Sequence, residues 1–346
     1  MQPIEDAEFI ELARILGWNV VVKKGEFKVG DKAVYFEIDS VLPEDNPDFD
    51  FLKNSKGKQK ALKPKRIRGI VSQGLALPID ILKNYEGSME EETDVTDFLK
   101  VKKREEIEFD KPFYKNAQNF RKSTFPPFIQ KTDETRVQVL QKQLDKANGK
   151  SFVVTEKLDG TSFTAFIREG KFGICSRNME VALNVPSPYS DVAIANDLEN
   201  KFKELRENVI PYDFAIQGEI IGNGIQGNKY KLQGFECRLF NFFNIDKQKD
   251  IGFYVGDVKE FEDFQGFTLG QVAALLDLQT VPILDSNFVM TNDIDTLVEY
   301  SKGNSVLNPE TTREGVVFRL KNNNEISNYG ERISFKAINP DFLCPL

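Results

Sequence analysis

The stretch Val153-Val154-Thr155-Glu156-Lys157-Leu158-Asp159-Gly160-Thr161-Ser162 is the most informative part of this 346-residue chain. Its apolar first half predicts a strand, and the Asp-Gly pair predicts a turn just after the lysine. A lysine held at a strand end can attack an electrophile such as a nucleotide α-phosphate. The attack needs the neutral amine, which a nearby Mg²⁺, Lys or Arg would favour. Taken alone, the pattern also fits a surface strand that ends in a turn.

The composition predicts a globular protein of one or two domains. Hydrophobic residues make up 40% of the chain, charged residues 29%, and the net charge is −8. The chain contains no histidine, which excludes Ser-His-Asp hydrolysis, His-ligated zinc and imidazole acid–base chemistry. Catalysis therefore has to rely on other side chains or on a metal ion bound by oxygen atoms.

The cysteines and the first residues indicate an intracellular protein. Cys175, Cys237 and Cys344 lie far apart, and there is no C-x-x-C pair, which argues against a disulfide framework or a zinc knuckle. No apolar run is long enough for a membrane span, and the first residues have no signal-peptide pattern. We expect a location in the cytoplasm or the nucleus, without membrane contact.

The first hundred residues predict a small barrel or sandwich of short strands. The candidate strands are 18–22, 33–38 and a pair within 67–77, separated by glycine turns. Eight lysines and arginines lie between Lys53 and Arg68 with no acidic residue among them. Such a basic stripe suits contact with a phosphate backbone, and it equally suits a solvated loop.

The rest of the chain predicts a mixture of helices and strands. A charged, aromatic and proline-containing stretch at 101–135 suits an inter-domain connector. The predicted helices and strands follow from apolar spacing. The helices are 136–147 and 190–207, and the strands are 152–154, 163–166, 214–216 and 316–318.

Glu156-Lys157-Leu158-Asp159-Gly160 is similar to motif I of the covalent nucleotidyltransferases, which include DNA ligases, RNA ligases and mRNA capping enzymes. Five further segments resemble the other family motifs in the same order. They are Ser176-Arg177-Asn178 (motif Ia), 217–220 (motif III), 240–245 (motif IIIa), 314–317 (motif IV) and Ser334-Phe335-Lys336 (motif V). Each match is short, but six in the family's order are far more specific than any one of them.

The order of the segments resembles the RNA ligase 5 family. Only ten residues follow Lys336, whereas a β-rich region precedes motif I. Three other segments share this resemblance: 72–75, 131–136 and 224–230. The resemblance implies an α+β protein with an N-terminal OB-type β-barrel that binds RNA (1–110), whose first strand is short or missing. A nucleotidyltransferase domain of antiparallel sheets flanked by helices (111–346) would follow.

The resemblance assigns the chemistry to five residues. Lys157 would carry AMP as a lysyl-AMP intermediate, and Lys336 would contact the α-phosphate. Asp159, Glu219 and Glu314 would orient Mg²⁺ (or Mn²⁺) and its waters, or the ribose, because Mg²⁺ prefers oxygen ligands. Each of these carboxylates also fits an ordinary salt bridge at a strand end.

The same motifs place further residues around the nucleotide. Arg136 would bind the ATP phosphates, and Arg177 would lie near the ribose and the RNA end. Phe243 and Val317 would pack on the two faces of adenine, although Phe240 and Phe242 compete for the aromatic position. Two more positions complete this set. They are Glu156, as a nucleotide-binding residue, and Ser334, where many relatives have another lysine.

The resemblance implies an ATP-dependent RNA ligase acting in RNA repair. Its partners would be ATP, Mg²⁺ or Mn²⁺, and RNA with 3′-hydroxyl and 5′-phosphate ends, and the enzyme would be a monomer. Whether the RNA is single-stranded, nicked or splinted is left open. The alternatives are an ATP-dependent DNA ligase, a GTP-dependent capping-type enzyme and a non-catalytic RNA-binding protein.

Overall fold

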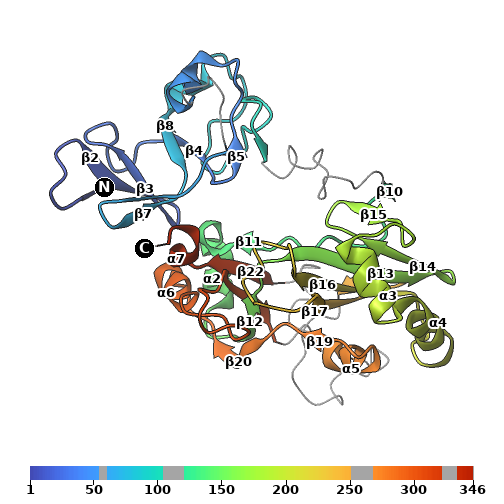
Figure 1. Ribbon diagram of the computed structural model, residues 1–346. Coiled ribbons are helices and arrows are strands. Elements are labelled where there is room, and N and C mark those ends of the chain that lie inside the picture. Colours follow the sequence, from blue (N-terminus) through green and yellow to red (C-terminus); the bar gives the residue numbers. More distant parts are fainter. Residues whose placement is uncertain (54–60, 104–120, 251–267, 322–332, 346) are drawn as a thin grey trace. The chain divides into compact units, whose positions relative to one another are not determined.

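The computed structural model describes residues 1–53, 61–103, 121–250, 268–321 and 333–345. Strands and helices both occur, so the predicted α+β class is confirmed (Figure 1). The chain divides into two compact units, Met1–Lys115 with Leu343–Leu346 and Asn116–Phe342. The predicted domain boundary after residue 110 lies outside the described residues.

The N-terminal unit is built of short antiparallel ladders, β1-β2-β3, β4-β8, β5-β9 and β6-β7. Hydrogen bonds also join one ladder to another, because the Gln73 amide donates to Asn19 O at 2.8 Å and the Val21 amide to Ser72 Oγ at 3.0 Å. The predicted strands of this region are confirmed. The elements are β1 Gln2–Pro3, β2 Ile10–Ile15, β3 Trp18–Lys23, β4 Ala33–Phe36, β5 Ser40–Val41, η1 Pro47–Leu52, β6 Lys65–Ile67, β7 Ile70–Ser72, β8 Leu75–Pro78, η2 Ile79–Leu82 and β9 Lys102–Lys103.

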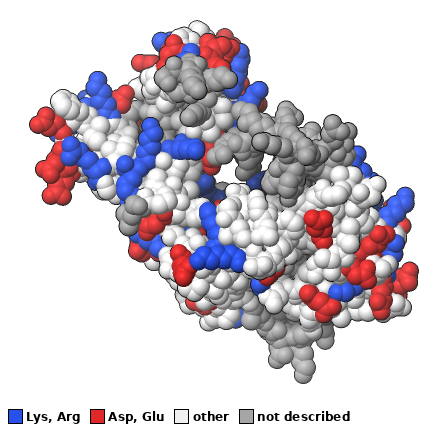
Figure 2. Space-filling view, viewed as in Figure 1, with Lys and Arg blue, Asp and Glu red and all other residues white. Residues whose placement is uncertain are grey.

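The basic stripe of this unit is only partly described. Lys56, Lys58 and Lys60 lie outside the described residues, whereas Lys63, Lys65 and Arg68 are exposed. Arg66 is engaged within the unit, since its guanidinium donates to Cys344 O at 2.7 Å. Figure 2 shows Lys and Arg side chains of this unit interspersed with acidic ones.

Two sheets form the centre of the second unit. The larger has the order β10-β15-β14-β13-β16-β17-β18 with β19 also on β17, and the smaller has the order β11-β22-β21-β12-β20. The strands are β10 Arg121–Thr124, β11 Thr135–Arg136, β12 Ser151–Lys157, β13 Thr161–Arg168, β14 Lys171–Cys175, β15 Met179–Val181, β16 Phe214–Gly222, β17 Phe235–Asn244, β18 Lys249–Asp250, β19 Gln279–Thr280, β20 Ile283–Val289, β21 Gly315–Leu320 and β22 Ser334–Ile338.

Helices pack on one face of each of these sheets. The opposite face of the larger sheet carries a second apolar cluster, which includes Phe166, Ala215 and Phe243. On the larger sheet, Phe202 of α4 stacks on Phe214 of β16 with ring centroids 4.8 Å apart. On the smaller sheet, Leu144 of α2 and Leu297 of α6 pack into a core with Phe318. The helices are η3 Val137–Val139, α2 Gln141–Ala147, α3 Pro188–Ala195, α4 Leu198–Asn208, α5 Leu269–Leu275, α6 Ile294–Tyr300 and α7 Pro340–Leu343. Within the described ranges, every helix is too short or too polar to span a lipid bilayer.

Two predicted helices differ from the structure. The helix expected over 136–147 begins only at Gln141, because Arg136 belongs to strand β11 and pairs in parallel with β22. The helix expected over 190–207 is two helices, α3 and α4. The chain turns between them at Asp197, whose backbone is left-handed with φ 50° and therefore cannot continue an α-helix.

Candidate active site

The turn after Lys157 joins the two sheets of the second unit. Strand β12 of the smaller sheet ends at Lys157, and strand β13 of the larger sheet begins at Thr161. Gly160 fits this turn because a Cβ atom there would lie 2.3 Å from the carbonyl oxygen of Ile220. Lys157 therefore lies at the junction of the two sheets.

The smaller sheet places several predicted residues on the face that carries Lys157. In the antiparallel register, Lys157 pairs with Gly315, and Val317 pairs with Lys336. Arg136 is the parallel partner of Lys336 on the next strand. Because paired residues and alternate residues of a strand share a face, Arg136, Val317 and Lys336 lie on the same face as Lys157.

The larger sheet contributes Glu219 and Phe243 from one of its faces. Glu219 and Ala215 lie on the same face of β16, and Ala215 pairs with Phe243. Phe243 is buried in an apolar cluster with Ala215. Phe242 lies on the other face, where its ring meets that of Phe214 at 5.7 Å, so it is packed away from Phe243 and Glu219.

Acidic side chains surround the Lys157 ammonium group. Its Nζ atom lies 2.7 Å from Glu314 Oε2, and Glu219 and Asp159 are near enough to act on its charge. Burial by itself would lower the pKa of Lys157, but the three carboxylates outweigh it and raise the pKa above the ordinary lysine value. The expected neighbouring cation is present, because Lys336 is close enough for Lys157 to act on its charge, but the carboxylates outweigh it and Lys157 is held as an ammonium group.

Two other groups of the site have strongly shifted pKa values. Burial, with repulsion from Glu314 and Asp159, raises the pKa of Glu219 to about 8 although Lys157 opposes the shift. Burial, with repulsion from Lys157 and Arg136, lowers the pKa of Lys336 to about 8. Like charges thus crowd this region, as is common at functional sites.

The donor set fits a divalent cation bound through its water molecules. In the described part of the chain, no group of three or more Cys, Asp or Glu side chains is arranged to hold a metal ion directly. Asp159, Glu219 and Glu314 nevertheless act together on Lys157, and hard carboxylate oxygens suit Mg²⁺, which keeps several waters. A cation here would also relieve the repulsion from Glu314 and Asp159, which adds to burial in raising the pKa of Glu219.

Glu156 and Arg177 are less closely associated with this group. Glu156 precedes Lys157 on the strand and so points to the opposite face, where its Oε2 accepts a hydrogen bond of 2.8 Å from the Val306 amide. Arg177 forms an ion pair of 2.8 Å with Asp133, and both side chains are largely exposed. Arg177 still lies close enough to help lower the pKa of Lys336.

A buried network that the motifs did not predict connects the two sheets. Arg319 of β21 donates to Phe240 O of β17 at 2.7 Å and forms an ion pair with Glu134 at 3.2 Å. Ser334 donates to the other oxygen of Glu134 at 2.6 Å. The sequence did contain a signal for this network. Arg319 lies within the apolar run Val316-Val317-Phe318-Arg319-Leu320, and a charged residue in a buried strand needs a polar partner.

Lys229 and Tyr230 were also missed, although they belong to a quoted motif. Tyr230 Oη accepts a hydrogen bond of 2.7 Å from the Asp159 amide, and the Lys229 ammonium group pairs with the Asp159 carboxylate. Only the positions of these side chains in space connect them with Lys157.

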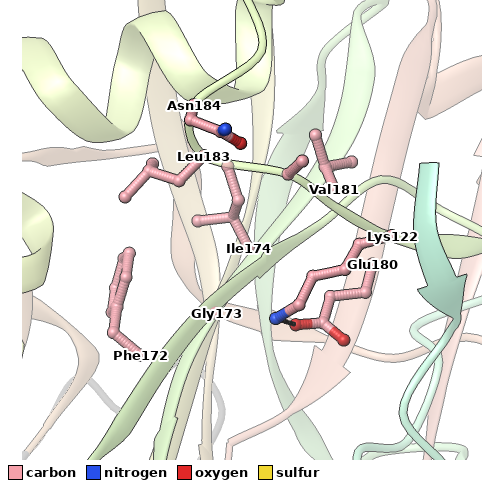
Figure 3. A pocket seen from close by; sticks show the side chains of 9 residues that line it. Lys122, Phe172, Gly173, Ile174, Glu180, Val181, Leu183 and Asn184 are labelled. Carbon is pink, nitrogen blue, oxygen red and sulfur yellow. Dashed lines mark hydrogen bonds and ion pairs between the residues drawn. The ribbon is translucent and has the colours of Figure 1, made fainter. Parts of the chain in front are cut away.

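A further pocket lies beside strands β14 and β15 (Figure 3). Lys122 and Glu180 form an ion pair of 2.6 Å on its wall, and Phe172 and Ile174 also line it. None of the predicted site residues is among its lining residues, so it is not part of the group around Lys157.

Comparisons with known proteins follow the division of the chain. A family model described as an OB-fold domain matches residues 1–79, and one described as RNA ligase matches residues 150–338. Both the predicted OB fold and the predicted family resemblance are thereby confirmed. A comparison with curated proteins found no match.

Solved structures of Naegleria gruberi RNA ligase resemble nearly the whole chain. A variant with ATP and Mn is 33% identical, with a TM-score of 0.78, and the match covers 99% of this chain and 95% of that chain. Another variant, with AMP and Mn, is 33% identical over the same shares with a TM-score of 0.77. A structure with PPi is 34% identical with a TM-score of 0.79, covering 99% of this chain and 94% of that chain.

Proposed function

This chain belongs to the RNA ligase family, and from this membership we propose that it is an ATP-dependent RNA ligase with Lys157 as the nucleophile. The observation that carries the proposal is the position of Lys157 at the junction of two sheets, with Asp159, Glu219 and Glu314 around it and Lys336 nearby. An ordinary exposed lysine in a surface turn would not have three carboxylates and a second lysine near its ammonium group.

In the first step, Lys157 Nζ attacks the α-phosphate of ATP. A phosphorus–nitrogen bond forms, the bond from the α-phosphate to the bridging oxygen breaks, and pyrophosphate leaves. Lys157 must first lose a proton to the solvent, so its ion pair with Glu314 has to be given up as the substrate binds. Arg136 and Lys336 stabilise the negative charge that develops on the phosphate oxygens.

Two further steps use the lysyl-AMP to seal RNA. The 5′-phosphate of the RNA attacks the AMP phosphorus, and the neutral amine of Lys157 is released. The 3′-hydroxyl then attacks the activated 5′-phosphate, a phosphodiester bond forms and AMP leaves. The same positively charged groups serve each step because negative charge develops on phosphate oxygens every time.

A divalent cation would supply electrostatic stabilisation of the phosphate oxygens at this site. Asp159, Glu219 and Glu314 would hold it through its waters, because Mg²⁺ prefers oxygen ligands and keeps several of its water molecules. The relatives with ATP and Mn support the same choice of substrate and metal.

The remaining predicted residues bind the nucleotide in this proposal. Phe243 and Val317 would pack on the faces of the adenine ring, one from each sheet. Arg177 would lie near the ribose and the RNA end. Glu156 is held on the opposite face from Lys157, so we propose for it an indirect role in fixing the strand under the nucleotide.

The RNA would carry a 3′-hydroxyl and a 5′-phosphate, as nicked or splinted duplex or as free ends in repair. The N-terminal domain, 1–110, would bind its backbone through exposed cations such as Lys63, Lys65 and Arg68.

The enzyme would act as a monomer. It would act in the cytoplasm or nucleus, because the free cysteines Cys175 and Cys237 are buried and suit a reducing compartment.

Incubation with α-labelled ATP and Mg²⁺ tests the mechanism. The unchanged protein should become covalently labelled, Lys157→Ala should not, and Lys171→Ala should be labelled normally because that lysine is exposed. Label that survives Lys157→Ala would refute the role of Lys157. Labelling by GTP in place of ATP would indicate a capping-type enzyme, and preference for DNA 3′-hydroxyl ends would indicate a DNA ligase. RNA binding without label or sealing would indicate a non-catalytic protein.

A further inference from the structure

The loop between β16 and β17, residues 223–234, contacts the turn that follows Lys157. Tyr230 Oη accepts the Asp159 amide hydrogen bond at 2.7 Å, and Gln226 Nε2 donates to Gly160 O at 3.4 Å. The Lys229 ammonium group forms an ion pair with Asp159 Oδ2. The loop thus contacts both the backbone and the carboxylate of the turn.

The backbone of Lys229 is fixed in place by its neighbours. The side-chain amide of Asn308 donates to Lys229 O at 2.7 Å. Asn228 has a left-handed backbone, φ 48°, and its Oδ1 accepts the Leu232 amide at 3.0 Å. Tyr230, the next residue, is buried. Because the residues on both sides are held, the direction in which the Lys229 side chain leaves the loop is fixed.

The Lys229 ammonium group has a second contact besides Asp159. Its Nζ atom lies 3.9 Å from the centre of the Phe342 ring of α7, within the range of a cation–π interaction. The ring therefore keeps the ammonium group beside the carboxylate, and it can still hold that group if the carboxylate turns to another cation.

An ammonium group and a hydrated divalent cation compete for the same carboxylate oxygens. A lysine ammonium group is a compact point charge whose hydrogen bonds occupy the lone pairs that metal-bound waters would use. Among the three acids of the proposed metal site, Glu314 pairs with Lys157 and Asp159 pairs with Lys229. Lys157 is required for the chemistry, whereas Lys229 is outside the proposed reaction.

We infer that Lys229 is a positioning residue that sets the affinity of the site for its divalent cation, by acting as the counter-ion of Asp159 that the cation must displace. This inference rests on the proposed metal role of Asp159. It gives the loop motif 224–230 a function: the loop holds the Lys229 ammonium group, which a metal ion can displace, beside the turn that follows Lys157.

Binding of Mn²⁺ in the absence of ATP, followed by electron paramagnetic resonance, tests the inference directly. Lys229→Met should bind Mn²⁺ about twofold to fivefold more tightly than the unchanged protein, a range that corresponds to a partly exposed ion pair. Lys229→Arg should bind nearly as the unchanged protein does. Phe342→Leu should give a smaller gain, because it only weakens the hold on the ammonium group.

Lys231→Met is the matched control, because Lys231 lies in the same loop but pairs with exposed Glu310. It should leave Mn²⁺ affinity unchanged, and adding Asp159→Asn to Lys229→Met should abolish the gain. Unchanged or weaker Mn²⁺ binding by folded Lys229→Met, as judged by circular dichroism, would overturn the inference while leaving the proposed ligase intact. If the unchanged protein did not bind Mn²⁺ in this assay, the metal role of the acids and the inference would both fail.

Discussion

The pKa of Lys157 should fall when its nearest carboxylate is neutralised. Glu314→Gln keeps the size and the accepting oxygen of the side chain but removes the charge 2.7 Å from Lys157 Nζ. At an effective dielectric constant of about 20, two unit charges about 3 Å apart attract by roughly 5 kcal/mol. The Lys157 side chain is 26% exposed, and Glu219 and Asp159 remain, so only part of this energy appears in the pKa.

We therefore expect Glu314→Gln to lower the pKa of Lys157 by about 1 to 2 pH units, since each unit corresponds to about 1.4 kcal/mol. The measurement is the pH dependence of the modification of Lys157 by acetic anhydride, read by peptide mass spectrometry without ATP or metal. Glu310→Gln is the control, because Glu310 pairs with Lys231 and not with Lys157.

An unchanged or higher pKa of Lys157 in Glu314→Gln would refute this electrostatic account, provided circular dichroism shows the variant folded. An equal fall in Glu310→Gln would refute it as well, because the effect would then not depend on the contact. Either result would mean that the ion pair with Glu314 is not what keeps Lys157 protonated.

Three other changes test the fold around the site. The pKa of Lys336 is about 8 in the folded chain and 10.5 in the unfolded chain, so the unfolded state binds more protons between these values. In urea titrations the free energy of unfolding of the unchanged protein should therefore rise relative to that of Lys336→Met across that window; the comparison cancels the opposite effect of the buried thiols Cys175 and Cys237, whose pKa values are raised by burial. Arg319→Met should cost about 3–5 kcal/mol in the same assay, because it leaves the Glu134 carboxylate buried without its partner. Gly160→Ala should sharply reduce labelling by ATP while the protein stays folded, since its Cβ would displace the Ile220 carbonyl beside the turn; normal labelling would contradict this.

The predicted strands depended on local patterns, and the structure contains them. Phe152-Val153-Val154 and Val316-Val317-Phe318 are apolar runs that form buried neighbouring strands, β12 and β21. Arg136 is different, because helical spacing continues through it while the structure places it in β11. Its pairing with Lys336, 200 residues further along, supplies backbone hydrogen bonds that no local propensity can indicate.

Site residues that belong to a sequence motif could be predicted, whereas residues that only the tertiary structure brings to the site could not. Lys157, Asp159 and Glu314 were identified from short motifs, and the structure brings their charges together. The ion pair of Lys229 with Asp159 depends on the path of a loop with left-handed residues, which no spacing rule describes. Arg319 was equally hidden, because its partners are Glu134 and a backbone carbonyl on another sheet.

Strand β12 ends and β13 begins within four residues of Lys157, so the reactive amine lies at a seam. The smaller sheet carries Lys336 and Val317 on one side of this junction, and the larger sheet carries Glu219 and Phe243 on the other. A mutation that alters the packing of either sheet would therefore move the Lys157 amine relative to the site residues of the other sheet. Remote core substitutions in this unit should accordingly damage turnover before they damage folding.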